Sequence, residues 1–239
     1  MERQFRDRTE AGRLLAERLK EYANRSDVIV LALPRGGVPV GYEVAKALCA
    51  PLDVLIVRKL GVPGQEELAL GAIASGGVLV MNQELLSFLS ISEEEIEEMV
   101  AREQRELERR ERLYRSGRPA PEVRGKTVIV VDDGIATGTS MRSAVEVLKQ
   151  QQPAKVIIAV PVAARSTCEE FNRPAKHEVS VCLQTPEPFF AVGLWYEDFT
   201  QTTDEEVRNL LDRAAREETA YSFDLAQSRY DYQNGAPNR

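Results

Sequence analysis

Runs of consecutive apolar and β-branched residues, separated by segments with helical spacing, most constrain how this chain can fold. The clearest runs are residues 28–33 (VIVLAL), 127–131 (TVIVV) and 156–162. A strand that is apolar on both faces is typical of a parallel sheet covered by helices. Because helical segments alternate with the runs, we predict an α/β fold whose parallel sheet is flanked by helices through right-handed crossovers.

The remaining elements follow from the same periodicities and from turn residues. Further strands are expected at 53–57 and 178–183, and two short ones within 69–81 around Gly76 and Gly77. The expected helices are 7–22, 38–48, 139–150, 165–171 and 204–217. Residues 60–67 (LGVPGQEE) are expected to form a Gly/Pro loop, and the polar residues from 222 onwards a poorly packed tail.

The segment 92–115 (SEEEIEEMVAREQRELERRERLYR) is nearly saturated with charge and predicts a long helix. Ser92 followed by Glu95 forms a capping box. Pairs of opposite charge four residues apart, Glu98 with Arg102 and Glu106 with Arg110, support the helix. Its thin apolar stripe, Ile96, Val100, Leu107 and Tyr114, fits either a solvated helix or a helix at a dimer contact.

Composition excludes several classes of protein. The length of 239 residues fits one large domain or a small pair, and the net charge of −7 argues against binding to nucleic acid or to an anionic membrane. The N-terminus lacks the apolar core of a signal peptide, and no apolar stretch is long enough for a membrane span. Three scattered cysteines without a CxxC spacing predict reduced thiols and a cytoplasmic protein.

The presence of a single histidine, His177, limits which catalytic and metal sites the chain can form. Metal sites built on a pair of histidines are excluded, and any Ser-His or Cys-His hydrolase would depend on this one residue. His177 stands at the entrance of an expected strand, a position that favours a surface role.

The chemistry-bearing stretch is 127–141, TVIVVDDGIATGTSM. The strand delivers Asp132 and Asp133 to its carboxyl end, the edge where ligands bind in open α/β sheets. Gly134 and Gly138 allow backbone amides to crowd around an anion at the start of the next helix. Carboxylates accept hydrogen bonds from hydroxyls or hold a hydrated cation. A phosphate on one side and a diol on the other describe a ribose 5-phosphate.

This stretch resembles the ribose-phosphate loop of type I phosphoribosyltransferases. In that family the pattern is four apolar residues, two acids, three variable residues, then Thr-Gly, followed by Gly, Thr or Lys and finally Ser or Thr. The resemblance implies a type I phosphoribosyltransferase-like fold with a small hood. It also implies a set of residues that bind phosphoribosyl pyrophosphate: Asp132, Asp133, Gly134, Ala136, Thr137, Gly138, Thr139 and Ser140.

Two further segments agree with this family. Residues 34–37 (PRGG) stand where the family has its pyrophosphate loop, which implies a cis peptide between Pro34 and Arg35 and pyrophosphate binding by Arg35, Gly36 and Gly37. Residues 58–64 (RKLGVPG) look like the segment that leads into the catalytic loop of adenine phosphoribosyltransferases. Arg35, Arg58 and Lys59 would then neutralise the leaving diphosphate, and 62–70 would form a mobile lid.

Residues 188–199 (PFFAVGLWYEDF) are similar to the hood of hypoxanthine-guanine enzymes. By that resemblance Phe190, Ala191 and Trp195 bind a base and Glu197 lies near the metal and diphosphate, although both aromatics also fit a core under a loop. Val162 stands where those enzymes have a lysine, and Ala136 where they have an acid. The base is therefore not readable from the sequence.

The resemblance as a whole covers residues 28–198 and most resembles a group of stand-alone bacterial predicted phosphoribosyltransferases. It implies a Mg²⁺-dependent transferase in which Asp132, Asp133 and Glu197 hold the metal, mostly through water or the substrate. Ribose 5-phosphate would move from phosphoribosyl pyrophosphate to a nitrogen nucleophile, most simply a nucleobase. A sensor that binds the same ligand without transfer, and a hydrolase that uses the paired aspartates, are the alternatives.

The expected organisation is one domain over 1–221 with a tail at 222–239. Its core spans 27–185, the charged helix 92–116 is an insertion, and the hood is formed by 186–203 with the N-terminal segment. The family also implies a homodimer.

Overall fold

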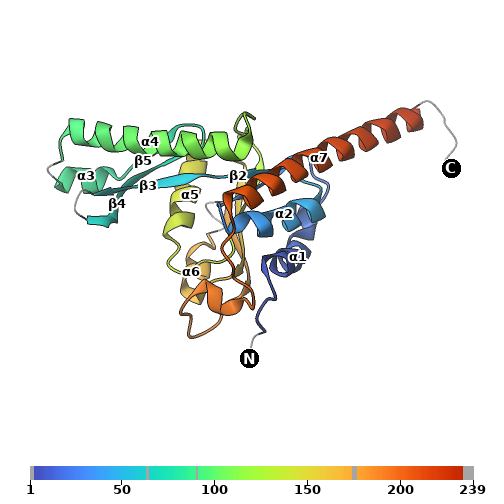
Figure 1. Ribbon diagram of the computed structural model, residues 1–239, viewed down its shortest axis with the longest axis horizontal. Coiled ribbons are helices and arrows are strands. Elements are labelled where there is room, and N and C mark those ends of the chain that lie inside the picture. The colour runs from blue at the N-terminus through green and yellow to red at the C-terminus, as the bar shows by residue number, and fades with distance from the viewer. Residues whose placement is uncertain (1–2, 63–64, 90, 174–176, 234–239) are drawn as a thin grey trace.

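The computed structural model describes residues 3–62, 65–89, 91–173 and 177–233, with 65–68 and 220–233 described by their backbone. A five-stranded sheet in the order β2-β1-β6-β7-β8 forms its centre (Figure 1). All four strand pairs are parallel. The strands are β1 (Val28–Ala32), β2 (Leu52–Val54), β6 (Thr127–Val131), β7 (Lys155–Val162) and β8 (Glu178–Gln184). The prediction of an α/β fold with a parallel sheet is confirmed.

Helices cover both faces of this sheet. On one face Val28 and Val30 pack with α1 (Arg8–Leu19) and α2 (Gly37–Leu48). On the other face Ile29 and Leu31 pack with α5 (Thr139–Gln150), next to α6 (Arg165–Glu170). Successive residues of a strand point to opposite faces, so the continuous apolar runs fill two separate cores.

A second, antiparallel sheet lies beside the first. It consists of β3 (Val57–Val62), β4 (Gln65–Ala74) and β5 (Val78–Met81), with Gly76 and Gly77 at positive φ in the last turn. A short helix that the sequence analysis missed, α3 (Gln83–Phe88), follows β5. The long helix α4 (Glu93–Arg115) runs beside this sheet in Figure 1 and packs on it, burying Leu60, Leu70 and Leu107 together.

Helix α4 is capped as predicted, and its buried face is broader than the predicted stripe. The Ser92 and Glu95 side chains cap each other's backbone. Leu107 and Tyr114 are fully buried, and Glu103 and Arg115 are buried as well. Glu106 pairs with Arg110 as expected, whereas Arg102 pairs with its neighbour Glu103. In this structure α4 therefore covers the small sheet.

The last helix, α7 (Asp204–Gln233), is longer than predicted. The Thr203 hydroxyl accepts from the Glu206 amide at its start, and Val207 and Leu211 pack into the core shared with α4. The sequence pattern predicts an end at residue 217 and a poorly packed tail from residue 222. The backbone continues as helix to Gln233, and its last part extends away from the sheet in Figure 1.

The region between the two sheets corrects two further predictions. The strand expected at 53–57 divides into β2, which pairs with β1, and the start of β3, which pairs with β4. The expected loop and lid at 60–70 is mostly strand, because the backbones of 57–62 and 65–74 pair with each other. Residues 63–64 of that segment lie outside the described residues.

The cysteines also differ from the prediction of reduced thiols. Cys168 on α6 and Cys182 on β8 form a disulfide, and Cys49 is a free, exposed thiol. The crossover from β7 through α6 to β8 brings the two elements side by side, and their 14-residue separation carries no sequence signal. Among the helices that the structure describes, none is long and apolar enough to cross a membrane.

Candidate active site

The site lies at the carboxyl ends of β1 and β6. These strands are direct neighbours in parallel register, with Ala32 opposite Val131. The segments that follow them, 33–37 and 132–140, therefore leave the sheet side by side. The Leu33 amide donates to the Val131 carbonyl across 2.8 Å, which continues the pairing one residue past β1. The structure thus brings together the PRGG and DDGIATGTS segments that the sequence analysis singled out.

Glycine is required at both positions of the PRGG pair. A Cβ atom at Gly36 would lie 2.0 Å from Oδ2 of Asp133. One at Gly37 would lie 2.7 Å from the Val131 carbonyl oxygen and 2.9 Å from the Cα of Asp132. Since real Cβ atoms do not approach other atoms this closely, any side chain here would displace the acid pair.

Two helix N-termini point to this edge without a side-chain cap. Helix α2 begins after Gly36 and α5 after Gly138, and the described residues give neither a side-chain hydrogen bond at its N-cap. Gly138 has φ 76°, a left-handed conformation that glycine adopts without strain. The exposed Ala136, Thr137, Thr139 and Ser140 surround the start of α5. At α5 the helix dipole, the first-turn amides and the hydroxyls of Thr137, Thr139 and Ser140 favour an anion. At α2 the Gly37 and Val38 amides donate to the Leu33 and Arg35 carbonyls, so the helix dipole and the Arg35 side chain remain to favour one.

Asp132 and Asp133 lie between the two termini and are largely buried. Burial raises the pKa of Asp132 well above its ordinary value, and the neighbouring Asp133 charge raises it further. Burial also raises the pKa of Asp133, while Arg8 opposes that shift. The Asp133 amide donates to Oδ1 of Asp132 across 2.9 Å and orients that carboxylate. Two buried acids this close require positive charge or hydroxyl donors for full ionisation.

Arg8 supplies that positive charge, and the sequence analysis missed it. Its Nε atom donates to Oδ2 of Asp133 across 2.8 Å, with both side chains less than 15% exposed. Its Nη1 atom donates to the Thr200 carbonyl across 2.8 Å, and its guanidinium lies 4.0 Å from the centre of the Phe199 ring. Arg8 sits in an ordinary amphipathic helix, so no local pattern distinguishes it from the other arginines of that helix.

The hood segment 186–203 packs against the start of the loop that follows β6. The Tyr196 hydroxyl donates to the Asp133 carbonyl across 2.6 Å, and the Val192 side chain packs so closely on Gly134 that a Cβ there would lie 2.5 Å away. Of the predicted base-binding residues, Phe190 is 77% exposed and Ala191 is exposed. Trp195 is half-buried in the hood core, and its Nε1 atom has no hydrogen-bond partner among the described residues.

Arg35, Arg58 and Lys59, the cations predicted to neutralise the diphosphate, lie in two different segments of the structure. The Pro34–Arg35 peptide is cis, as the resemblance implied, and Arg35 stands half-exposed at the start of α2 with Nη1 3.7 Å from Oδ1 of Asp204. Arg58 lies within β3 and binds the buried Glu103 of α4, with Nη2 2.6 Å from Oε2. Lys59 follows it in the same strand.

The acid pair fits a hydrated magnesium ion better than a fully protein-ligated metal. Mg²⁺ is usually held by one or two carboxylates, waters and substrate phosphates. Asp132 and Asp133 provide two carboxylates, and the described residues contain no cluster of three or more metal-ligating side chains. The Glu197 amide donates to the Phe5 carbonyl, and Glu197 is exposed. No contact among the described residues joins it to the acids, so its metal role stays a prediction.

The structure is an α/β fold whose sheet edge carries a buried acid pair between two helix N-termini. The chain belongs to the phosphoribosyl transferase domain family, whose model matches residues 6–187. It is 46% identical over 213 residues to "Putative phosphoribosyl transferase Rv0571c" of Mycobacterium tuberculosis strain H37Rv, and to its counterpart MT0597 in strain CDC 1551. These alignments cover 89% of this chain and 47% of each relative, so the chain spans about half their length.

A solved structure is similar along most of the chain. The crystal structure of TT1426 from Thermus thermophilus shares 43% sequence identity with a TM-score of 0.77. The match covers 87% of this chain and 97% of that one. A protein of similar sequence therefore has the same fold in a crystal structure.

Proposed function

We propose that this chain transfers ribose 5-phosphate from phosphoribosyl pyrophosphate to a nitrogen nucleophile and releases pyrophosphate. One observation carries the proposal: two uncapped helix N-termini flank a buried acid pair at one sheet edge. The order along this edge, from a site that favours an anion through a pair of acceptors to a second such site, agrees with the order of 5-phosphate, ribose hydroxyls and diphosphate in this substrate. Family membership supports the same substrate class.

In this proposal the chain acts by positioning and by electrostatics. The 134–140 loop holds the 5-phosphate, and Asp132 and Asp133 accept hydrogen bonds from the ribose hydroxyls. The nitrogen lone pair forms a bond to the anomeric carbon while the bond from that carbon to the diphosphate oxygen breaks. The diphosphate leaves with the electron pair, and the Gly36 amide, Arg35 and the dipole of α2 stabilise its charge, whereas the Gly37 amide already donates to the Leu33 carbonyl.

Magnesium would be held by the diphosphate and, through water, by Asp132 and Asp133, where it would neutralise the leaving group. The positive charge would also favour the ionised form of both acids, whose pKa values burial raises. Arg8 would keep Asp133 oriented toward the ligand from the other side.

The acceptor is proposed to be a planar nitrogen base. The exposed Phe190 and Ala191 on the hood offer a ring face and backbone groups beside the loop. Trp195 supports the hood from within its core and is proposed to shape the base pocket. The apolar Val162 and Ala136 argue against the polar readout of a 6-oxopurine.

A sensor that binds phosphoribosyl pyrophosphate without transferring ribose is the second candidate. The observation in its favour is Arg58, which the family resemblance places beside the diphosphate and which binds the buried Glu103 in this structure. A sensor and a transferase share the ligand and differ in product.

The deciding experiment measures pyrophosphate release from phosphoribosyl pyrophosphate and Mg²⁺ with a panel of purine and pyrimidine bases. Base-dependent release supports the transferase, and ligand binding without release supports the sensor. Release of inorganic phosphate without a base would favour the hydrolase. The double variant Asp132→Asn/Asp133→Asn should lose at least about 100-fold in release.

The matched control for that variant is Asp27→Asn. Asp27 lies at the opposite, amino end of β1, where its exposed side chain pairs with Arg25. The control should release pyrophosphate at the rate of the unchanged protein. Near-normal release by the Asp132/Asp133 double variant would contradict the proposal.

A further inference from the structure

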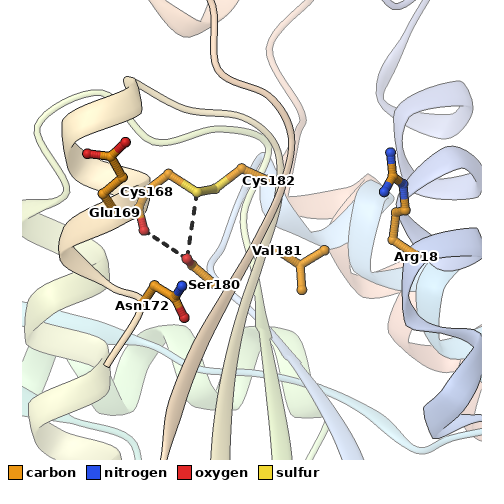
Figure 2. Close-up of a pocket in the computed structure, with 7 residues that line it drawn as sticks. All are labelled: Arg18, Cys168, Glu169, Asn172, Ser180, Val181 and Cys182. Atoms are coloured by element: carbon orange, nitrogen blue, oxygen red, sulfur yellow. Dashed lines mark hydrogen bonds between the residues drawn. A yellow bond between two sulfur atoms is a disulfide. The ribbon is translucent and has the colours of Figure 1, made fainter. Parts of the chain in front are cut away.

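The Cys168–Cys182 disulfide lines a solvent-open pocket at the edge strand β8, between α6 and α1. The pocket has a volume of about 420 Å³. Figure 2 shows the disulfide and Ser180 on the side of β8 that faces α6, and Val181 and Arg18 of α1 on its other side. Both cysteines are half-buried. A small thiolate therefore has room to reach the sulfur atoms.

The disulfide joins β8 to the helix that supports the 134–140 loop. The Thr167 hydroxyl, one residue before Cys168, donates to the Ala136 carbonyl across 3.0 Å. A Cβ atom at Gly138 would lie 2.8 Å from Cγ2 of Thr167 and 3.2 Å from the Phe171 ring. The loop thus rests directly on α6.

A second contact from α6 reaches the loop through an arginine. Glu170 accepts two hydrogen bonds from Arg142, across 2.8 and 2.7 Å, and Arg142 donates to the Thr137 carbonyl across 2.7 Å. Cys168 lies between Thr167 and Glu170 in the same short helix. A helix of six residues has little stability of its own, so its position depends on its attachments.

We propose that Cys168–Cys182 is a reversible thiol-exchange site for a dithiol reductant, and that its reduction loosens α6 and with it the 134–140 loop. One thiolate of the dithiol attacks a sulfur of the disulfide and releases the other cysteine as a thiol. The second thiol of the reductant then closes its own disulfide and frees the remaining cysteine. Two electrons pass from the dithiol to the protein disulfide.

The loosening is expected to be partial. The Ser180 hydroxyl donates to the Cys168 carbonyl across 2.8 Å, and this bond between β8 and α6 does not need the disulfide. Weaker ligand binding rests on the proposed function of the loop, whereas the change in loop order does not. Coupling between two sites of one protein commonly amounts to about 5- to 150-fold in affinity, so we expect a change near the lower end.

The test compares the oxidised protein with the same protein treated with dithiothreitol. A thiol count in denaturant should find Cys49 alone before treatment and all three cysteines after it. Hydrogen exchange should become faster at 136–141 and 165–171 on reduction and stay unchanged in β1 and β6. The dissociation constant for phosphoribosyl pyrophosphate should rise about 5-fold.

Two variants provide the controls. Cys168→Ser/Cys182→Ser should behave as the reduced protein and no longer respond to dithiothreitol. Cys49→Ser should respond as the unchanged chain does. Three thiols before treatment, identical exchange in both states, or faster exchange across the whole sheet would each overturn the proposal. If exchange responds and the oxidised protein binds no phosphoribosyl pyrophosphate, the proposed function fails while the redox site stands.

Discussion

The guanidinium of Arg8 donates to the carboxylate of Asp133 across 2.8 Å and joins the first turn of α1 to the end of β6. Both side chains are nearly enclosed, and the Phe199 ring covers the arginine. The pair connects the N-terminal helix, the hood and the acid pair. Removal of one partner would leave the other charge buried without compensation.

Replacement of Arg8 by alanine should therefore lower the free energy of unfolding by about 3 kcal/mol. Arg13→Ala in the same helix is the matched control, because the Arg13 side chain is 64% exposed in its pair with Glu43. The control should cost less than about 1 kcal/mol. Urea denaturation measures the free energy of unfolding of both variants. Equal losses would show that the Arg8–Asp133 pair stabilises the fold no more than an exposed pair does.

The pH dependence of stability should depend on Asp132. Burial and the Asp133 charge raise its pKa in the folded chain above the ordinary 3.8, so the folded state holds its proton more tightly than the unfolded state. Stability from this group is then lost as pH rises above 3.8 and through the folded pKa. Asp132→Asn should raise the free energy of unfolding at neutral pH by on the order of 1 kcal/mol.

Unfolding measured between about pH 5 and about pH 8 checks this sign. The free energy of unfolding should fall less steeply with pH in Asp132→Asn than in the unchanged chain. In Asp27→Asn its pH dependence should stay unchanged, because a hydrogen bond from Arg25 lowers the pKa of Asp27 below that range. A variant that loses stability at neutral pH would contradict the assignment of Asp132 as a buried, destabilising charge.

Gly36→Ala should impair the site without straining the backbone. The φ of Gly36 is −62°, which alanine adopts freely, yet its Cβ would lie 2.0 Å from Oδ2 of Asp133. The carboxylate must move, and we expect the dissociation constant for phosphoribosyl pyrophosphate to rise at least about 10-fold, or about 1.4 kcal/mol. Calorimetry measures this constant directly.

Gly117→Ala is the matched control for that substitution. Its φ is 85° and nothing lies within 4 Å of its Cβ position, so the change strains the backbone and leaves the site untouched. It should cost about 1 kcal/mol of stability with unchanged ligand affinity. Equal affinities in the two variants would indicate that Gly36 does not border the ligand.

The hydroxyls at the start of α5 should contribute to phosphate binding. Thr139 and Ser140 are exposed in its first turn, where the Thr139 oxygen lies 3.3 Å from the Thr137 oxygen. Hydrogen bonds to a charged group are worth about 1.5–3 kcal/mol. The double variant Thr139→Ala/Ser140→Ala should therefore raise the dissociation constant for phosphoribosyl pyrophosphate at least about 10-fold. Ser143→Ala, one turn further along, should leave the affinity unchanged.

The end of the proposed domain at residue 221 can be tested by truncation. A chain that stops at Tyr221 should unfold within about 0.5 kcal/mol of the full chain. Leu211→Ala, in contrast, opens a cavity beside Val207 and α4 and should cost about 2–5 kcal/mol. A large loss on truncation would show that the last part of α7 belongs to the folded domain.

The amino-acid sequence by itself determined the central sheet, its flanking helices and the place of the 134–140 loop that we propose to bind phosphate. These features depend on contiguous patterns: apolar runs at 28–33 and 127–131, helical spacing, and the acids and glycines directly after β6. The capping box of α4 and the cis peptide before Arg35 were predictable for the same reason, since each belongs to a short local pattern or to the family resemblance it supports.

Only the tertiary structure decided which distant residues complete the site. Arg8 binds Asp133, which lies 125 positions further along the sequence, and Arg58 binds Glu103, which lies 45 positions further along. Cys168 forms a disulfide with Cys182 because a crossover places their elements side by side. The pairing of β3 with β4 likewise turned an expected lid into a hairpin. Such contacts form because the fold brings segments that are distant in sequence together. A local pattern of residues does not determine which distant segments become neighbours.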